Sequence, residues 1–196
     1  MDQAQELSQE TIREFVGAAH GDLAQVKALH QQDPALLNAR YLEWNETALE
    51  AAAHMGRWGI AEYLLSQGAP LTICAASMLG MTGRVAEFLQ TDPGLAHATG
   101  AHGIPVLFHA ALSGDTEIAE LLVAHGGGEG LAQALHGATA YGHKEMAEWI
   151  LDRGANVNAL DWQDKTPLRV AVELGSTDLA ALLRQRGGTE WPAPNG

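Results

Sequence analysis

Histidine offers the widest chemistry in this chain, because an imidazole can bind a metal ion or carry a proton near neutral pH. The sequence has 9 histidines among 196 residues. His136 and His143 stand seven residues apart, with an expected turn between them. No HExxH motif, no CxxC motif and no pair of histidines four residues apart accompanies them, and such spacings place ligands on one side of a metal ion. We therefore expect no metal site and no other cofactor.

Hydrolytic chemistry is the second possibility. His109 and Ser113 are four residues apart, so they would share one face of a helix, and Asp115 follows closely. A Ser-His-Asp triad also needs an oxyanion site and a base that its third member orients, and no motif supplies them. The single cysteine, Cys74, lies in the uncharged stretch GAPLTICAASMLGM (68–81), which predicts a small buried side chain rather than a nucleophile. The residues favour a protein that is not an enzyme.

The stretch GATAYGHKE (137–145) has the glycine separation of a phosphate-binding loop. His143 intervenes before Lys144, however, and neither serine nor threonine follows the lysine. No strand is expected before the first glycine either. Because phosphate binding by such a loop needs all three features, the stretch does not predict a nucleotide site.

The charge balance limits the partners. Acidic residues outnumber basic ones 24 to 11, for a formal net charge of -13, which repels nucleic acid and weakly favours basic partners. One cysteine allows no internal disulfide and fits a cytoplasmic protein. The N-terminal MDQAQELSQE lacks the pattern of a secretory signal, and no apolar run approaches the roughly 20 residues of a membrane span. We expect a cytoplasmic protein that binds neither nucleic acid nor a membrane.

The elements that position these side chains follow from an internal repeat. The segment AYGHKEMAEWILDRGANVNALD (140–161) has close copies at 54–69, 112–127 and 173–188 and weaker copies at 20–34 and 79–93. In the clearest copies, apolar residues follow a glycine by four, five, eight and nine positions, which makes one stripe along a helix. After Gly114 these residues are Ile118, Ala119, Leu122 and Val123. Such a helix cannot bury its stripe alone, so stacked repeats must supply the core.

This repeat resembles the ankyrin repeat, and the TPLH-like starts at Thr47, Pro105 and Thr166 strengthen the resemblance. It implies an all-α solenoid of paired helices with a few short β-hairpin fingers. The Ala- and Gly-rich composition and the short repeats give an impression of a bacterial source. His136 stands at the histidine of the TPLH-like motif, where the family uses the ring to tie neighbouring loops. The resemblance covers residues 11–188 as six repeats, between a polar lead (1–10) and a tail (189–196), at about 11–37, 38–70, 71–95, 96–128, 129–155 and 156–188.

The spacing of the glycines between the helices of each pair is irregular. The separations alternate between long and short, at 35, 24, 34, 28 and 33 residues, for Gly21, Gly56, Gly80, Gly114, Gly142 and Gly175. A short step has no room for a hairpin. We therefore expect three fingers, at about 38–47, 96–105 and 156–166, and direct joins at 68–72 and 126–130.

The resemblance also implies where a ligand binds, because ankyrin domains generally hold proteins in a groove lined by finger tips and first helices. Each expected finger carries a ring near its tip, and the two residues before each inter-helix glycine face the groove in the family's pattern. These positions offer an apolar centre with an acidic rim, which favours a protein or peptide with apolar anchors and some basic charge. The candidate binding residues are Trp44, Glu46, His54, Met55, Met78, Leu79, His102, Ile104, Ser113, Tyr141, Trp162 and Lys165.

Other interpretations remain at this point. The finger rings can lie as staples across the neighbouring finger, and Met78 and Leu79 can pack under their neighbours because no hairpin precedes them. A small-molecule regulator or an enzyme would need a pocket between His54, Met78, His109 and Tyr141. Self-association through the same apolar residues is a third alternative. We expect a monomeric, non-enzymatic adaptor, inhibitor or regulator.

Overall fold

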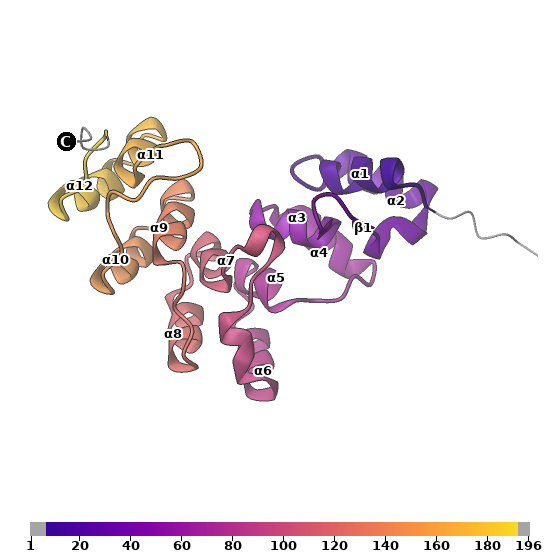
Figure 1. The fold of residues 1–196 in the computed structure, drawn as a ribbon, viewed down its shortest axis with the longest axis horizontal. Coiled ribbons are helices and arrows are strands. Elements are labelled where there is room, and N and C mark those ends of the chain that lie inside the picture. Colours follow the sequence, from indigo (N-terminus) through magenta and orange to yellow (C-terminus); the bar gives the residue numbers. More distant parts are fainter. Residues whose placement is uncertain (1–6, 192–196) are drawn as a thin grey trace, which may run out of the picture.

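A computed structural model describes residues 7–191, so residues 1–6 of the expected lead and 192–196 of the expected tail lie outside the described part. Helices follow one another from the N-terminal end of the molecule to its C-terminal end (Figure 1). Their bounds are α1 Gln9–Ala18, α2 Leu23–Gln32, α3 Ala48–His54, α4 Trp58–Ser66, α5 Ile73–Met78, α6 Thr82–Thr91, α7 Val106–Ser113, α8 Thr116–Ala124, α9 Leu131–Ala140, α10 Lys144–Asp152, α11 Pro167–Glu173 and α12 Thr177–Gln185. Short 3-10 helices are η1 Pro34–Asn38, η2 Pro93–His97 and η3 Ala101–Gly103.

Local sequence explains where these helices begin and end. Thr47 starts α3 with a capping box, in which its side chain accepts from the Glu50 amide and the Glu50 carboxylate accepts from the Thr47 amide. Thr72 and Thr166 cap α5 and α11 with their hydroxyl groups. Five of the glycines that separate paired helices have positive φ, which glycine adopts without the strain that a Cβ brings, namely Gly56, Gly80, Gly114, Gly142 and Gly175. Gly21 is not among the residues with positive φ.

The helices form two rows. The first helices of the pairs pack in order, with α1 on α3, α3 on α5, α5 on α7, α7 on α9 and α9 on α11. The second helices form the other row, in which α2 packs on α4 and α6, α8, α10 and α12 pack in succession (Figure 1). The prediction of an all-α solenoid of paired helices is confirmed.

The fingers lie where the spacing predicts them, but paired strands form in only the first. There β1 (Arg40–Tyr41) pairs antiparallel with β2 (Glu46–Thr47). The second has a single bridge between Thr99 and Pro105, around η3. In the third, residues 156–166 form turns, and the prediction of a hairpin is wrong there. The Asp161 carboxylate accepts from the amides of Gln163 and Lys165, and the Asp161 amide donates to the Lys165 carbonyl oxygen, so side-chain and backbone hydrogen bonds together close this turn.

The core falls into two clusters that meet at α5. One cluster contains Phe15 and Leu64 from the first four helices, together with Ala75 and Met78 of α5. The other contains Ile73 and Cys74 of α5 and continues to α12. The predicted stripe is buried at Ile118, Ala119 and Leu122 and half-buried at Val123. No helix within residues 7–191 combines the length and the apolar character needed to cross a lipid bilayer.

Candidate functional site

We call the row of first helices the inner row, and the surface that it forms with the fingers the inner surface. The N-terminal half of this surface is organised around Glu46. This residue lies in β2 opposite Tyr41, directly before the residue that caps α3. Its side chain is fully buried, with 0% exposure. We predicted Glu46 as part of an exposed acidic rim, and that placement is wrong, because the side chain lies among imidazole rings from three other segments.

Three histidines face the Glu46 carboxylate. His54 Nδ1, at the end of α3, is 2.9 Å from Oε1. His20 Nε2, just after α1, is 3.5 Å from Oε2, and His102 Nε2, in the second finger, is 3.7 Å from the same oxygen. The His54 ring stands edge-on to both other rings, with centroids 5.3 Å apart in each case. We call Glu46, His20, His54 and His102 the histidine cluster.

Neither oxygen of this carboxylate has a hydrogen-bond partner within the described residues, although the three imidazoles lie close to it. His20 Nδ1 is 3.0 Å from the Val16 carbonyl oxygen, and His54 Nδ1 is 3.2 Å from that of Glu50. A backbone carbonyl can only accept, so these contacts place a proton on each Nδ1. The donor set of imidazole nitrogens and a carboxylate is one that binds divalent transition metals.

Two of the predicted finger rings pack locally. Trp44 is 38% exposed and stands edge-on to Tyr41 of its own finger, at 4.9 Å between centroids, and to His20 at 5.8 Å. His102 has a positive φ of 58° and lies against His54 of the repeat that carries the first finger. The staple interpretation therefore holds for His102, whereas Trp44 staples its own finger rather than a neighbouring one.

Tyr141, at the end of α9, reaches across the inner row. Its hydroxyl group donates to the Met55 carbonyl oxygen at 2.9 Å, and its ring stands edge-on to Trp58 with centroids 4.9 Å apart. Gly56 makes this approach possible, since a Cβ there would lie 2.3 Å from the Tyr141 oxygen. Burial raises the pKa of Tyr141. We call this contact the Tyr141 bridge; it gives Tyr141 a packing role while leaving 37% of the residue exposed.

Met78 does not face a groove, and its predicted role as an exposed contact is wrong. It is fully buried, and its carbonyl oxygen accepts from Trp58 Nε1 at 3.0 Å. Met78 is the last residue of α5, a helix of six residues that are all buried. Leu79, Met55, Ile104 and Ser113 are intermediate in exposure, and the Ser113 hydroxyl donates to the Ala110 carbonyl oxygen.

The C-terminal part of the surface has several exposed apolar side chains, including the most exposed one among the described residues. Trp162, in the third finger, is 87% exposed, and Leu160 beside it is 45% exposed. Leu174, directly after α11, is 56% exposed. Lys165 joins this region through an ion pair with Glu173, at 2.7 Å between Nζ and Oε2. We call Leu160, Trp162, Lys165 and Leu174 the C-terminal patch.

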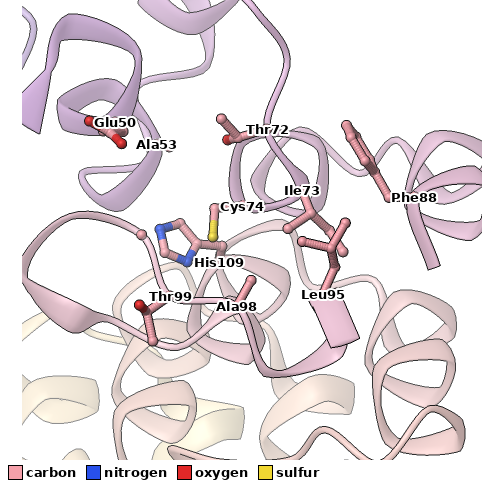
Figure 2. A pocket seen from close by; sticks show the side chains of 11 residues that line it. Glu50, Ala53, Thr72, Ile73, Cys74, Phe88, Leu95, Ala98, Thr99 and His109 are labelled. Carbon is pink, nitrogen blue, oxygen red and sulfur yellow. The ribbon is translucent and has the colours of Figure 1, made fainter. Parts of the chain in front are cut away.

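A cavity of about 260 Å³ lies behind the inner row, and Figure 2 shows Cys74 and His109 among its lining side chains. Of the four residues predicted to form a small-molecule pocket, only His109 lines it. Burial raises the pKa of Cys74 to about 12 and lowers that of His109 to about 4. Both groups are therefore neutral near pH 7, which leaves no thiolate and no imidazolium for catalysis. His109 Nδ1 donates to the Pro105 carbonyl oxygen at 3.1 Å.

His136 has the role that its motif position implied. Its Nε2 lies 2.9 Å from the Ala159 carbonyl oxygen, so the ring ties α9 to the third finger.

Models of the ankyrin repeat match this chain over residues 44–76, and models of three consecutive copies match over 71–161 and 107–192.

The chain belongs to the ankyrin repeat family. Ankyrin repeats generally mediate protein–protein interaction and are typically non-enzymatic. This ankyrin chain is 29% identical over 184 residues to an L-asparaginase of Dirofilaria immitis, over 86% of its own length and 30% of that protein. It is 33% identical over 89 residues to the diacylglycerol kinase iota of Rattus norvegicus and of Homo sapiens, which covers 41% of the chain and 8% of each kinase. The chain thus spans less than a third of the length of these relatives.

The sequence predicted Glu46, His54 and His102 as candidate contacts, but it predicted neither His20 nor the convergence of the four side chains. Metal ligands were expected along one helix, whereas His20 and His54 are 34 residues apart, close to one repeat. Both stand one or two residues before an inter-helix glycine. That shared placement is a signal for their proximity, but the burial of Glu46 has no signal of that kind.

Proposed function

We propose that this ankyrin chain is a non-enzymatic binding module, an adaptor, inhibitor or regulator that holds a segment of another protein along its inner surface. The observation that supports it most is the C-terminal patch. A tryptophan that is 87% exposed, two residues from the exposed Leu160, is unfavourable in water and suits the apolar anchors of a partner.

The charge of the chain favours a partner with basic segments. With a formal net charge of -13, the surface attracts basic segments and raises their rate of encounter. We therefore propose a partner segment that carries apolar side chains flanked by lysine or arginine. Among the predicted contacts, Trp162 and Lys165 stay in this proposal, while Met78 is removed because it is buried.

We also propose that α1 and α2, which precede the matched range, form a first repeat, so that the molecule has six. The packing of α1 on α3 and of α2 on α4 continues both rows, which supports this count. We propose a cytoplasmic location, for which the single buried cysteine gives support.

Selection of peptides from a random display library on the immobilised chain tests the binding proposal. We expect enriched peptides to combine apolar and basic residues, and the double variant Trp162→Ala, Leu174→Ala to bind them at least roughly tenfold more weakly. Gln90→Ala, an exposed change on α6 in the other row, is the control and should bind like the wild type. Both variants should unfold within a few degrees of the wild type.

Equal binding by the double variant would contradict the proposed surface. Sedimentation velocity at several concentrations provides a second check. A concentration-dependent increase in mass that the double variant abolishes would assign the C-terminal patch to a second copy of this chain instead.

A further inference from the structure

We propose that the histidine cluster is a site for one divalent transition metal ion of the Zn²⁺ type, with Glu46, His20 and His54 as ligands and His102 as the fourth. This inference is independent of the proposed protein-binding function. It rests on the geometry of the cluster, on the burial of Glu46 and on the hydrogen bond behind the His20 ring.

The geometry is close to that of a metal site. One ligand atom from each of His20, Glu46 and His54 lies within 4.8 Å of the others. Ligand atoms around tetrahedral Zn²⁺ are about 3.3 Å apart, given bond lengths near 2.0–2.1 Å. The distances from Glu46 Oε2 to His20 Nε2 and His102 Nε2, 3.5 and 3.7 Å, lie close to that value, while His54 approaches Oε1 through Nδ1 at 2.9 Å. Small rotations of the side chains would therefore suffice to bring the donors around one ion.

The buried carboxylate points to a cation. Glu46 has 0% exposure, and neither of its oxygens has a hydrogen-bond donor within residues 7–191. A buried carboxylate without compensation is strongly unfavourable, so it is either paired with positive charge or bound to a metal. No lysine or arginine forms an ion pair with it among the described residues, and only histidines face it.

The His20 ring is also held as metal-binding histidines usually are. A histidine ligand commonly donates its second ring N–H to a backbone carbonyl or a carboxylate, which fixes the tautomer and the ring orientation. His20 donates from Nδ1 to Val16, so its Nε2, which faces Glu46, carries the free lone pair. His54 differs, because its Nδ1 lies near both the Glu50 carbonyl oxygen and Glu46 Oε1, so this ring has to rotate to present Nε2 to the metal.

His102 completes the set from another part of the chain. It is a non-glycine residue with φ of 58°, a conformation that costs energy and concentrates at functional positions. A metal at this position would connect the end of α1, the first finger, the end of α3 and the second finger. Imidazole-rich donors select Zn²⁺, Cu²⁺, Ni²⁺ or Co²⁺ over Mg²⁺ and Ca²⁺.

Calorimetric titration of the full chain, purified without a histidine tag and treated with a chelator, tests this site. With ZnCl₂ we expect one equivalent to bind, and CoCl₂ should give the visible spectrum of four-coordinate Co²⁺. Glu46→Gln and His54→Ala should each weaken binding at least roughly tenfold, and His102→Ala should change the Co²⁺ spectrum. His125→Ala, which removes an exposed histidine elsewhere, should leave both results unchanged.

Thermal unfolding separates metal binding from the alternative that protonated histidines alone balance the charge of Glu46. Zn²⁺ should raise the Tm of the wild type, because a ligand that binds only the folded state stabilises it. The same addition should leave the Tm of Glu46→Gln unchanged, and circular dichroism will show that this nearly isosteric variant folds. The proposal is overturned if Zn²⁺ fails to bind, if binding persists in Glu46→Gln and His54→Ala, or if only acidification stabilises the wild type.

Discussion

Histidine side chains perform two different tasks in this molecule. His136 and His143 each contact a backbone carbonyl oxygen of a neighbouring segment, at 2.9 Å in both cases. These contacts connect successive repeats, since His143 reaches α7 and His136 reaches the third finger. The rings of His20, His54 and His102 instead face a carboxylate. His109 differs from both groups, because it is buried beside a cavity and has no partner for Nε2 among the described residues.

The burial of His109 predicts a dependence of stability on pH. Its pKa falls from 6.5 to about 4 on folding, mainly because burial disfavours the charged ring. Between these values the unfolded chain binds more protons than the folded one, so the free energy of unfolding decreases as pH falls from 6.5 toward 4. We expect His109 to account for a loss of roughly 2–3 kcal/mol over that window.

Urea unfolding of the wild type and His109→Gln at pH 7.5 and pH 4.5 measures this loss. The variant should lose less stability than the wild type over the interval. His125→Gln, at an exposed position, should behave like the wild type. Parallel losses in the wild type and in His109→Gln would show that His109 is not the group responsible.

The short helix α5 determines much of the packing at the scale of elements. Its six residues are all buried, and the five apolar ones divide between the two clusters. At the end of α5, the Met78 carbonyl oxygen accepts a hydrogen bond from Trp58 Nε1 of α4. A helix that serves two cores in this way tolerates neither charge nor a change in volume.

Met78→Ala should therefore destabilise the protein by about 2–5 kcal/mol, because it leaves a cavity at a fully buried position. Denaturant unfolding monitored by circular dichroism provides the measurement. Met81→Ala is the matched control, since Met81 is 39% exposed at the start of α6, and it should stay within about 0.5 kcal/mol of the wild type. Equal effects of the two changes would mean that Met78 is not a core residue.

The helices were predictable from the sequence because two independent signals mark each pair, the apolar stripe and the inter-helix glycine. The conformation of the second and third fingers was not predictable, since a glycine spacing fixes the length of a connection and not its hydrogen bonds. The side chain of Asp161 and the positive φ of His102 determine those hydrogen bonds locally. The site was predicted only in part, because the position of Glu46 and the reach of Tyr141 depend on contacts between distant repeats.

At the scale of the whole molecule, the two core clusters indicate an N-terminal and a C-terminal region that meet at α5 and at Leu112 of α7. Repeat proteins derive their stability from each repeat and from its interfaces with the next. Within the row of second helices, the packing of α4 on α6 is weaker than that of the pairs on either side. The connection between the N-terminal and C-terminal regions thus depends on the row of first helices and on the Tyr141 bridge.

Phe15→Ala tests this division. Phe15 is fully buried in the N-terminal cluster, and its truncation should cost about 3–5 kcal/mol locally. Hydrogen exchange should then accelerate in α1–α4 and change little in α11 and α12. Leu183→Ala, in the C-terminal cluster, should give the opposite distribution. A uniform acceleration in both variants would indicate one cooperative unit.

The Tyr141 bridge also has a consequence for the order of events during synthesis. The ring of Tyr141 covers Gly56 and Met55, which precede it by 85 and 86 residues. At about 5–20 residues per second, a ribosome needs roughly 4–17 seconds to make the intervening chain. Throughout that interval the second helix pair lacks the contact with Tyr141. The packing of the early repeats is therefore complete only after the fifth helix pair has been synthesised.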